Sequence, residues 1–147
     1  MKTIIIYDSK TSNTKKIAIA ISAALNAKLV RAGEEVDFDK YDLIGIGSGT
    51  YAGKPSKKIR RLLTSLPNLG GKKAFAFATF GGQRTGLDMI KHSLAESGAK
   101  VIGDWGCRGS FLVYINWGRP DERDFKSAKE FAREIKKELT QKASVLK

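Results

Sequence analysis

A run of small polar residues follows the first apolar segment of the chain, Ile4-Ile5-Ile6-Tyr7. Hydroxyl and amide groups donate hydrogen bonds to phosphate oxygens without carrying a charge themselves. Where such residues open a helix, free backbone N–H groups and the helix dipole add to the attraction for an anion. The pattern favours a phosphate site over a merely over-supplied helix cap, in which Ser12 or Asn13 would do the capping. The polar residues are Ser9, Thr11, Ser12, Asn13 and Thr14, with Lys10, Lys15 and Lys16 adding positive charge.

Two common nucleotide-binding motifs do not match. The segment SGTYAGKP approaches the P-loop pattern, but Ser48 replaces its first glycine and Pro55 replaces its magnesium-binding hydroxyl. The segment GIGSGT ends in Thr50 where a dinucleotide fingerprint needs its third glycine. A receiver domain would need an acceptor aspartate in this same region, which reads GIGSGTY. The sequence therefore argues against nucleoside triphosphates, dinucleotides and phosphoacceptor chemistry.

Length and composition are those of one globular domain, which we assign to residues 1–147. The hydrophobic content of 41% and the charged content of 29% are ordinary for such a domain. No apolar run approaches a membrane span, and the opening MKTIIIYD is too short for a signal peptide. The single cysteine, Cys107, excludes an internal disulfide and a cysteine-based metal cluster. We therefore expect a cytoplasmic protein.

The net charge of +12 is concentrated in the middle of the chain. Residues 43–87 hold eight basic side chains and no Asp or Glu, whereas both flanking parts nearly balance their charges. Such a block can attract nucleic acid, an acidic partner protein or an anionic ligand. Its simplest explanation is a solvated helix face that keeps the protein in solution.

Five short segments are predicted to be strands. Apolar runs without polar alternation at residues 3–7, 43–47 and 74–79 are typical of strands buried on both faces of a parallel sheet. Residues 27–31 predict an edge strand, and residues 101–105 predict a fifth strand.

Four helical segments separate or follow these strands. Each shows apolar residues three or four positions apart on one face. Pro55 suits the first helical position of the second segment, and Gly98 suits the C-terminal cap of the third. The four apolar stripes are Ile17, Ile21 and Leu25; Ile59, Leu62, Leu63 and Leu66; Leu87, Ile90 and Leu94; and Phe125, Ala128, Ala132, Ile135 and Leu139.

Strands alternating with helices predict an open α/β sheet covered by helices on both faces. In such sheets ligands bind beyond the carboxyl ends of the strands, where the strand order reverses. We therefore expect the site in the loops that follow Tyr7, Gly47, Thr79 and Trp105.

Across its whole length the sequence resembles the flavodoxin family. Residues 9–14 resemble the family pattern [ST]-x-T-G-x-T, and Thr50-Tyr51-Ala52-Gly53 resembles its threonine, aromatic and glycine loop. The segments CRGSF and GRPDERDFKSAKEFA resemble a branch of short flavodoxin-type proteins. The resemblance implies a five-stranded parallel sheet of order 2-1-3-4-5 and flavin mononucleotide, FMN, as the cofactor.

The resemblance assigns FMN contacts to three loops. Tyr51 is the expected stacking aromatic, and Ser12 replaces the glycine of the family's first loop. The third loop, TFGGQRTG, lacks the acid and the tyrosine that many flavodoxins place against the ring, so Phe80 stacks there or one ring face is open. The predicted cofactor-binding residues are Ser9, Lys10, Thr11, Ser12, Asn13, Thr14, Gly49, Thr50, Tyr51, Ala52, Gly53, Thr79, Phe80, Gly81 and Gly82.

Three classes of function are compatible with these features. The first is an FMN electron carrier that serves redox partner proteins with acidic docking surfaces. The second is a small FMN-dependent reductase acting on NAD(P)H or a quinone. The third is a non-catalytic basic module that binds an acidic partner or nucleic acid. The match of two loops to the family favours flavin binding over the third class, and the short chain favours the carrier over the reductase.

Overall fold

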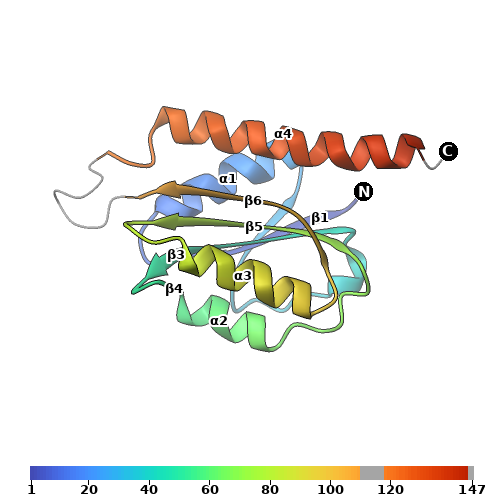
Figure 1. The fold of residues 1–147 in the computed structure, drawn as a ribbon, viewed down its shortest axis with the longest axis horizontal. Helices are drawn as coiled ribbons and strands as arrows, with labels where there is room; N and C mark the ends of the chain where they lie inside the picture. The colour runs from blue at the N-terminus through green and yellow to red at the C-terminus, as the bar shows by residue number, and fades with distance from the viewer. Residues whose placement is uncertain (110–117, 146–147) are drawn as a thin grey trace.

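The structure is a computed structural model that describes residues 1–109 and 118–145, with side chains up to residue 140 (Figure 1). Strands and helices alternate along the chain, as the apolar pattern predicts. In chain order the elements are β1 (Thr3–Asp8), α1 (Asn13–Leu25), β2 (Lys28–Arg31), the 3₁₀ helix η1 (Phe38–Lys40), β3 (Leu43–Tyr51), β4 (Lys54–Pro55), α2 (Lys57–Thr64), β5 (Lys73–Phe80), α3 (Thr85–Glu96), β6 (Lys100–Arg108) and α4 (Glu122–Val145).

The five long strands form a parallel sheet in the order β2-β1-β3-β5-β6. Counted without β4, this is the predicted order 2-1-3-4-5, and β2 is an edge strand as predicted. The sheet has a sixth strand that the sequence analysis does not predict. This strand, β4, pairs antiparallel with the end of β3.

The sheet is buried between two helical layers, so the protein has one apolar cluster on each face (Figure 1). Helices α1 and α4 cover one face, and α2 and α3 cover the other. On the α1 and α4 side, the rings of Phe75 and Phe77 lie over Gly45 and Gly47 of the neighbouring strand. A Cβ on either glycine would stand 2.3 or 2.1 Å from the ring atoms. Glycine in β3 therefore makes room for the two largest fully buried side chains of the core.

Three predicted boundaries are wrong in the middle of the chain. Strand β3 continues to Tyr51, so the second candidate loop is largely strand. Pro55 lies in β4 rather than in the first turn of a helix, and Ser56 caps α2 by accepting a hydrogen bond from the Ile59 N–H at 3.3 Å. Leu66 lies beyond the end of α2. The pairing of β3 with β4 determines where the chain turns. A single proline in the sequence does not indicate that pairing.

The other helix boundaries agree better with the sequence. Gly98 follows α3 with φ of +89°, which fits its predicted role at the helix end. No helix in the described part of the chain is both long enough and apolar enough to cross a membrane.

Candidate functional site

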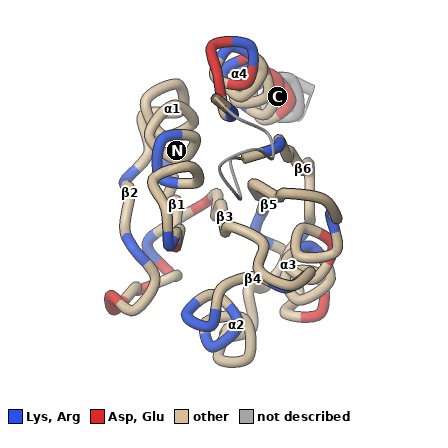
Figure 2. The backbone as a smooth tube through the Cα atoms, turned by 90° about the vertical axis from the view of Figure 1, so that its left-hand side faces the viewer, with Lys and Arg blue, Asp and Glu red and all other residues tan. Residues whose placement is uncertain are grey.

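The carboxyl ends of the central strands meet at one edge of the sheet, which faces the viewer in Figure 2. There Asp8 of β1 pairs with Ser48 of β3, and Gly49 of β3 pairs with Thr79 of β5. The chain leaves β1 towards α1 on one face and β3 towards α2 on the other. This edge is therefore the switch point at which open α/β sheets bind ligands, and it brings the three predicted loops together.

The first loop reaches the start of α1 without a side-chain cap. Ser12 holds the N-cap position with φ of −82°, and among the described residues its side chain makes no capping hydrogen bond. The Thr11 hydroxyl accepts a hydrogen bond from the Asn13 N–H at 3.4 Å, and Ser9 donates one to the Thr11 carbonyl. Because φ at Ser12 is negative, the backbone needs no glycine there. The serine is compatible with the fold of this loop and leaves the positive end of α1 available to an anion.

The buried end of this loop is tied to the third strand. The hydroxyl oxygens of Thr14 and Thr79 lie 2.8 Å apart, and either can donate to the other. Thr14 is 0% exposed and Thr79 is 5% exposed. These two predicted cofactor residues therefore interact with each other beneath the site, where they fix the position of the loop relative to β5.

An ion pair under the first loop was not predicted. Arg31, at the end of the edge strand β2, lies 3.3 Å from the Asp8 carboxylate and donates to the Ser9 carbonyl at 2.9 Å. This arginine brings a positive charge to the loop and orients its first peptide. The sequence carried a usable signal, because a basic residue ends β2 directly beside the acidic end of β1.

Tyr51 connects the second loop to the first. Its hydroxyl oxygen accepts a hydrogen bond from the Lys10 N–H at 2.8 Å, and the Lys10 ammonium lies 4.5 Å from the ring centre. The ring lies along its own strand over Gly49, where a Cβ would be 2.4 Å from the hydroxyl oxygen. Burial raises the pKa of Tyr51, and the Lys10 hydrogen bond partly opposes that effect. The tyrosine is thus neutral at physiological pH and lies directly beside the first loop.

The turn after Tyr51 is a tight hairpin with unusual backbone angles. Ala52 and Gly53 have φ of +52° and +78°, and Tyr51 pairs with Lys54 across them. Positive φ at both central residues is the signature of a type I′ turn. The Thr85 hydroxyl donates to the Gly53 carbonyl at 2.5 Å and fastens this turn to the start of α3. Ala52 is strained, since an alanine Cβ disfavours this conformation.

Thr50 faces away from the Tyr51 side of the strand. A Cβ on Gly86, in the first turn of α3, would lie 3.0 Å from its hydroxyl oxygen. That oxygen is buried and has no hydrogen-bond partner in the described part of the protein. The structure therefore places Thr50 under α3 rather than beside Tyr51.

The third loop directs its aromatic residue into packing. Phe80 lies against Gly106 of β6, where a Cβ would be 2.7 Å from the ring, and the Arg84 guanidinium lies 6.0 Å from the ring centre. Arg84 also pairs with Asp104 at 3.4 Å. The Gly81 carbonyl accepts a hydrogen bond from Arg108 at 3.0 Å, whereas a Cβ on Gly82 would meet nothing within 4 Å. In this loop Gly81 and Gly82 lie along the edge of the sheet, whereas Phe80 packs beside α3.

Two residues outside the loops pack in the core. The Trp105 indole N–H donates to the Ser127 hydroxyl at 3.0 Å, which joins β6 to α4. Cys107 is buried, and burial raises the pKa of its thiol to about 12. The described residues contain no group of three or more His, Cys, Asp or Glu side chains that could hold a metal ion.

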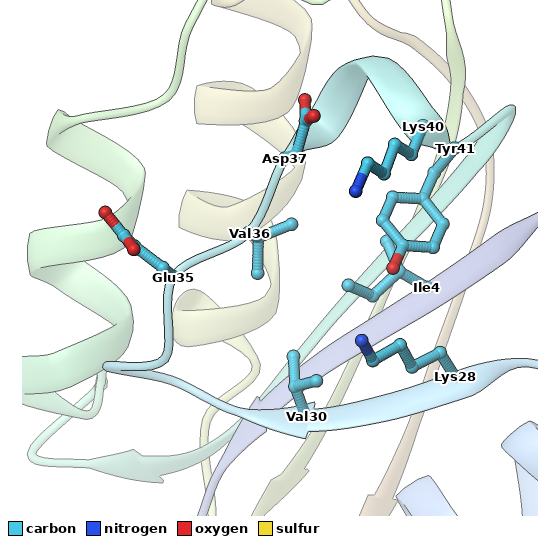
Figure 3. A pocket seen from close by; sticks show the side chains of 8 residues that line it. All are labelled: Ile4, Lys28, Val30, Glu35, Val36, Asp37, Lys40 and Tyr41. Carbon is cyan, nitrogen blue, oxygen red and sulfur yellow. The ribbon is translucent and has the colours of Figure 1, made fainter.

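A separate hollow of about 380 Å³ lies beside β2, away from the three loops (Figure 3). The ammonium groups of Lys28 and Lys40 point into it, and the Asp37 carboxylate points away. Basic and acidic residues balance around it, so we do not assign it to the ligand site. It is lined by Ile4, Lys28, Val30, Glu35, Val36, Asp37, Lys40 and Tyr41.

Taken together, the fold and the loops define a doubly wound α/β protein with a polar loop and a helix N-terminus at its switch point. Comparison with known sequences matches residues 4–115 to the flavodoxin domain, and the chain belongs to the flavodoxin family. It is 35% identical to the uncharacterized protein MJ0298 of Methanocaldococcus jannaschii, over 93% of this chain and 99% of that protein.

Two solved structures agree with this assignment. An archaeal flavodoxin aligns with a TM-score of 0.78 and 21% identity, over 95% of this chain and 99% of the other. A flavoprotein of Lactobacillus acidophilus in complex with FMN aligns with a TM-score of 0.57 and 25% identity, over 71% of this chain and 92% of the other.

Proposed function

We propose that the protein binds FMN at the carboxyl edge of its sheet and carries electrons between redox partner proteins. The observation that carries this proposal is the first loop. It offers exposed hydroxyl groups on Thr11 and Ser12 at a helix start whose N-cap residue, Ser12, makes no capping hydrogen bond among the described residues. This donor set suits a phosphate dianion, which needs several donors and positive potential but no acid nearby. Family membership and the similarity to an FMN complex support the same ligand.

In this proposal each loop contacts a different part of FMN. Ser9, Lys10, Thr11, Ser12 and Asn13 hold the phosphate, and Thr14 holds their loop in place through Thr79. Tyr51, Ala52 and Gly53 would form one wall of the ring site, with Gly49 beneath the tyrosine ring, and Gly81 and Gly82 would form the edge opposite. Thr50 and Phe80 would support these two walls from their packed positions beside α3. Bound FMN would supply the electron-transfer chemistry, while the chain binds it, orients it and limits its contact with water.

A basic surface next to this edge supports the choice of partner. Helix α2 exposes Lys57, Lys58, Arg60 and Arg61 (Figure 2). Positive potential of this kind raises the rate at which an acidic partner arrives. We therefore propose a redox partner with an acidic docking surface. We also propose a cytoplasmic location, since the single cysteine is a buried free thiol.

The decisive experiment compares FMN with riboflavin, which lacks the phosphate. Replacing Thr11 or Ser12 singly by alanine should weaken FMN about 10- to 150-fold in each case, since a hydrogen bond to a charged group is worth about 1.5–3 kcal/mol. Riboflavin affinity should stay unchanged. Thr64→Ala, which removes an exposed hydroxyl at the end of α2, is the matched control. Equal weakening of both flavins would show that the phosphate binds elsewhere. Absence of flavin binding would refute the proposal.

A second assay separates the carrier from the other two classes. The FMN-loaded protein should oxidise NAD(P)H slowly by itself, with or without a quinone, and should pass electrons rapidly to an added redox protein. Rapid NAD(P)H oxidation by the protein alone would assign it to the reductases. Salt-sensitive DNA binding by a protein that takes up no flavin would assign it to the basic binding modules.

A further inference from the structure

A groove runs between α1 and α4 on the outer face of that helical layer. Its volume is about 640 Å³. The two helices pack against each other beneath it through Ile17, Ala18, Ala128 and Ala132, all of which are fully buried. The floor of the groove is therefore part of the rigid core. Its lining residues are Lys16, Ile19, Ala20, Glu122, Phe125, Lys126, Lys129 and Arg133.

The lining combines apolar contact area with strong positive charge. Ile19 is 47% exposed and is one of three exposed large apolar side chains among the described residues, the others being Met1 and Met89. Ala20 and Phe125 are half-buried beside it. Four lining residues are basic and one is acidic. An exposed apolar patch rimmed by polar groups is the usual mark of an interaction surface.

The basic residues of this groove are not neutralised by neighbours. No ion pair joins Lys16, Lys126, Lys129 or Arg133 to another described residue. Basic residues of α4 outnumber acidic ones in this groove. Lys126, Lys129 and Arg133 line the groove beside α1 together with Glu122, whereas Glu134 and Glu138 line a different hollow beside β6 that also contains Lys137. The groove therefore carries an excess of positive charge that an acidic partner can neutralise.

We propose that the groove between α1 and α4 is a docking surface for an acidic helical segment of a partner protein, with apolar side chains on one face. Carboxylates of the segment meet the four cations, and its apolar side chains cover Ile19 and Phe125. A groove between two helices with apolar side chains in its lining suits an amphipathic helix. Lys16 lies about one helical turn after the first loop, so a segment docked here reaches the ligand edge of the sheet. The basic face of α2, on the opposite layer, is a separate surface.

A designed peptide tests this surface directly. The probe is an end-capped, fluorescein-labelled peptide of about 14 residues, long enough to form a helix, with leucine at every third or fourth position and glutamate elsewhere. Its affinity is measured by fluorescence anisotropy, with and without FMN on the protein. We expect binding in both states, with affinity falling at least about 10-fold when salt rises from 0.05 to about 0.5 M. A peptide with serine in place of leucine, and one with glutamine in place of glutamate, should each bind at least about 10-fold more weakly.

Two variant pairs locate the binding surface. Ile19→Ser should weaken the peptide about 10-fold, while Met89→Ser, an equally polar change at another exposed site, should not. The double variant K129Q/R133Q should weaken it similarly, while K28Q/K40Q, which removes the same charge elsewhere, should not. Circular dichroism and FMN uptake confirm that each variant is folded.

Three results would overturn the proposal. The first is absence of peptide binding at low salt. The second is an equal loss in groove and control variants, which would mean non-specific attraction to a basic protein. The third is tighter binding of anionic lipid vesicles or of DNA than of the peptide, with the loss of affinity again confined to the groove variants. Because the peptide is measured without FMN as well, a failure here leaves the proposed flavin site untouched.

Discussion

The contact between Thr14 and Thr79 gives a sharp prediction about how the first loop is held. Thr14→Val keeps the shape of the side chain but removes its hydroxyl, which leaves the buried hydroxyl of Thr79 without the partner it has at 2.8 Å. Leaving a buried polar group unsatisfied costs about 1–3 kcal/mol. For a chain of this size each kcal/mol lowers the melting temperature by about 2–4 °C, so the expected loss is about 2–12 °C.

The double variant separates this contact from other effects of the substitution. Replacing both threonines by valine removes both hydroxyls together, and this change should be nearly neutral. The stability of the double variant should therefore lie closer to that of the wild type than Thr14→Val does. Such a non-additive result in a double-mutant cycle measures the interaction between the two side chains. Thermal unfolding followed by circular dichroism supplies all four melting temperatures.

Flavin titration of the same variants tests what Thr14 does in the site. If Thr14 supports the loop from below, Thr14→Val weakens FMN and riboflavin by similar factors, because the whole loop loosens. The reasoning is refuted if Thr14→Val keeps its melting temperature and loses only FMN. That outcome would mean that the Thr14 hydroxyl binds the phosphate directly and that its contact with Thr79 does not stabilise the fold.

Three further changes have expected outcomes. Ala52→Gly should stabilise the protein by about 1 kcal/mol, because glycine relieves the strain of the left-handed turn at some cost in chain entropy. An unchanged midpoint of urea unfolding would contradict the turn assignment. Burial raises the pKa of Cys107 from 9.0, its ordinary value in an unfolded chain, to about 12. The neutral thiol therefore supports the fold fully below about pH 9, and this support is lost as the pH rises towards 12. A thiolate-selective reagent should therefore react slowly with the folded protein at pH 8 and rapidly in denaturant, and equal rates would refute the burial argument. K57Q/R60Q should slow association with an acidic redox partner and flatten the salt dependence of its rate, whereas an unchanged rate would exclude steering by α2.

The sheet was predictable because its strands are buried on both faces. Apolar runs such as 74–79 carry no polar alternation, and only a parallel sheet between two helical layers accommodates several of them in 147 residues. The strand order needed the family resemblance, since periodicity alone does not determine which strands are neighbours. The position of the site then followed from the topology, because parallel strands bring their following loops to one edge.

The details of the second loop were not predictable in the same way. The turn at Ala52 and Gly53 is a type I′ hairpin, but alanine is a poor residue for its first position, so the sequence signal for β4 is weak. Pro55 is common at helix starts and is also tolerated at a strand edge, which is where it lies. Contacts between distant residues, such as Tyr51 with Lys10, depend on the assembled edge and leave no local pattern.

The helical layer formed by α1 and α4 has a consequence for synthesis on the ribosome. About 100 residues separate the two helices, and ribosomes add about 5–20 residues per second. For several seconds or more the apolar face of α1, with Ile17 and Ile21, has no α4 to cover it, even if β1, β2 and β3 have already paired. A nascent chain of this protein therefore exposes a hydrophobic surface until α4 emerges, which makes it a natural client for chaperones that bind near the ribosomal exit.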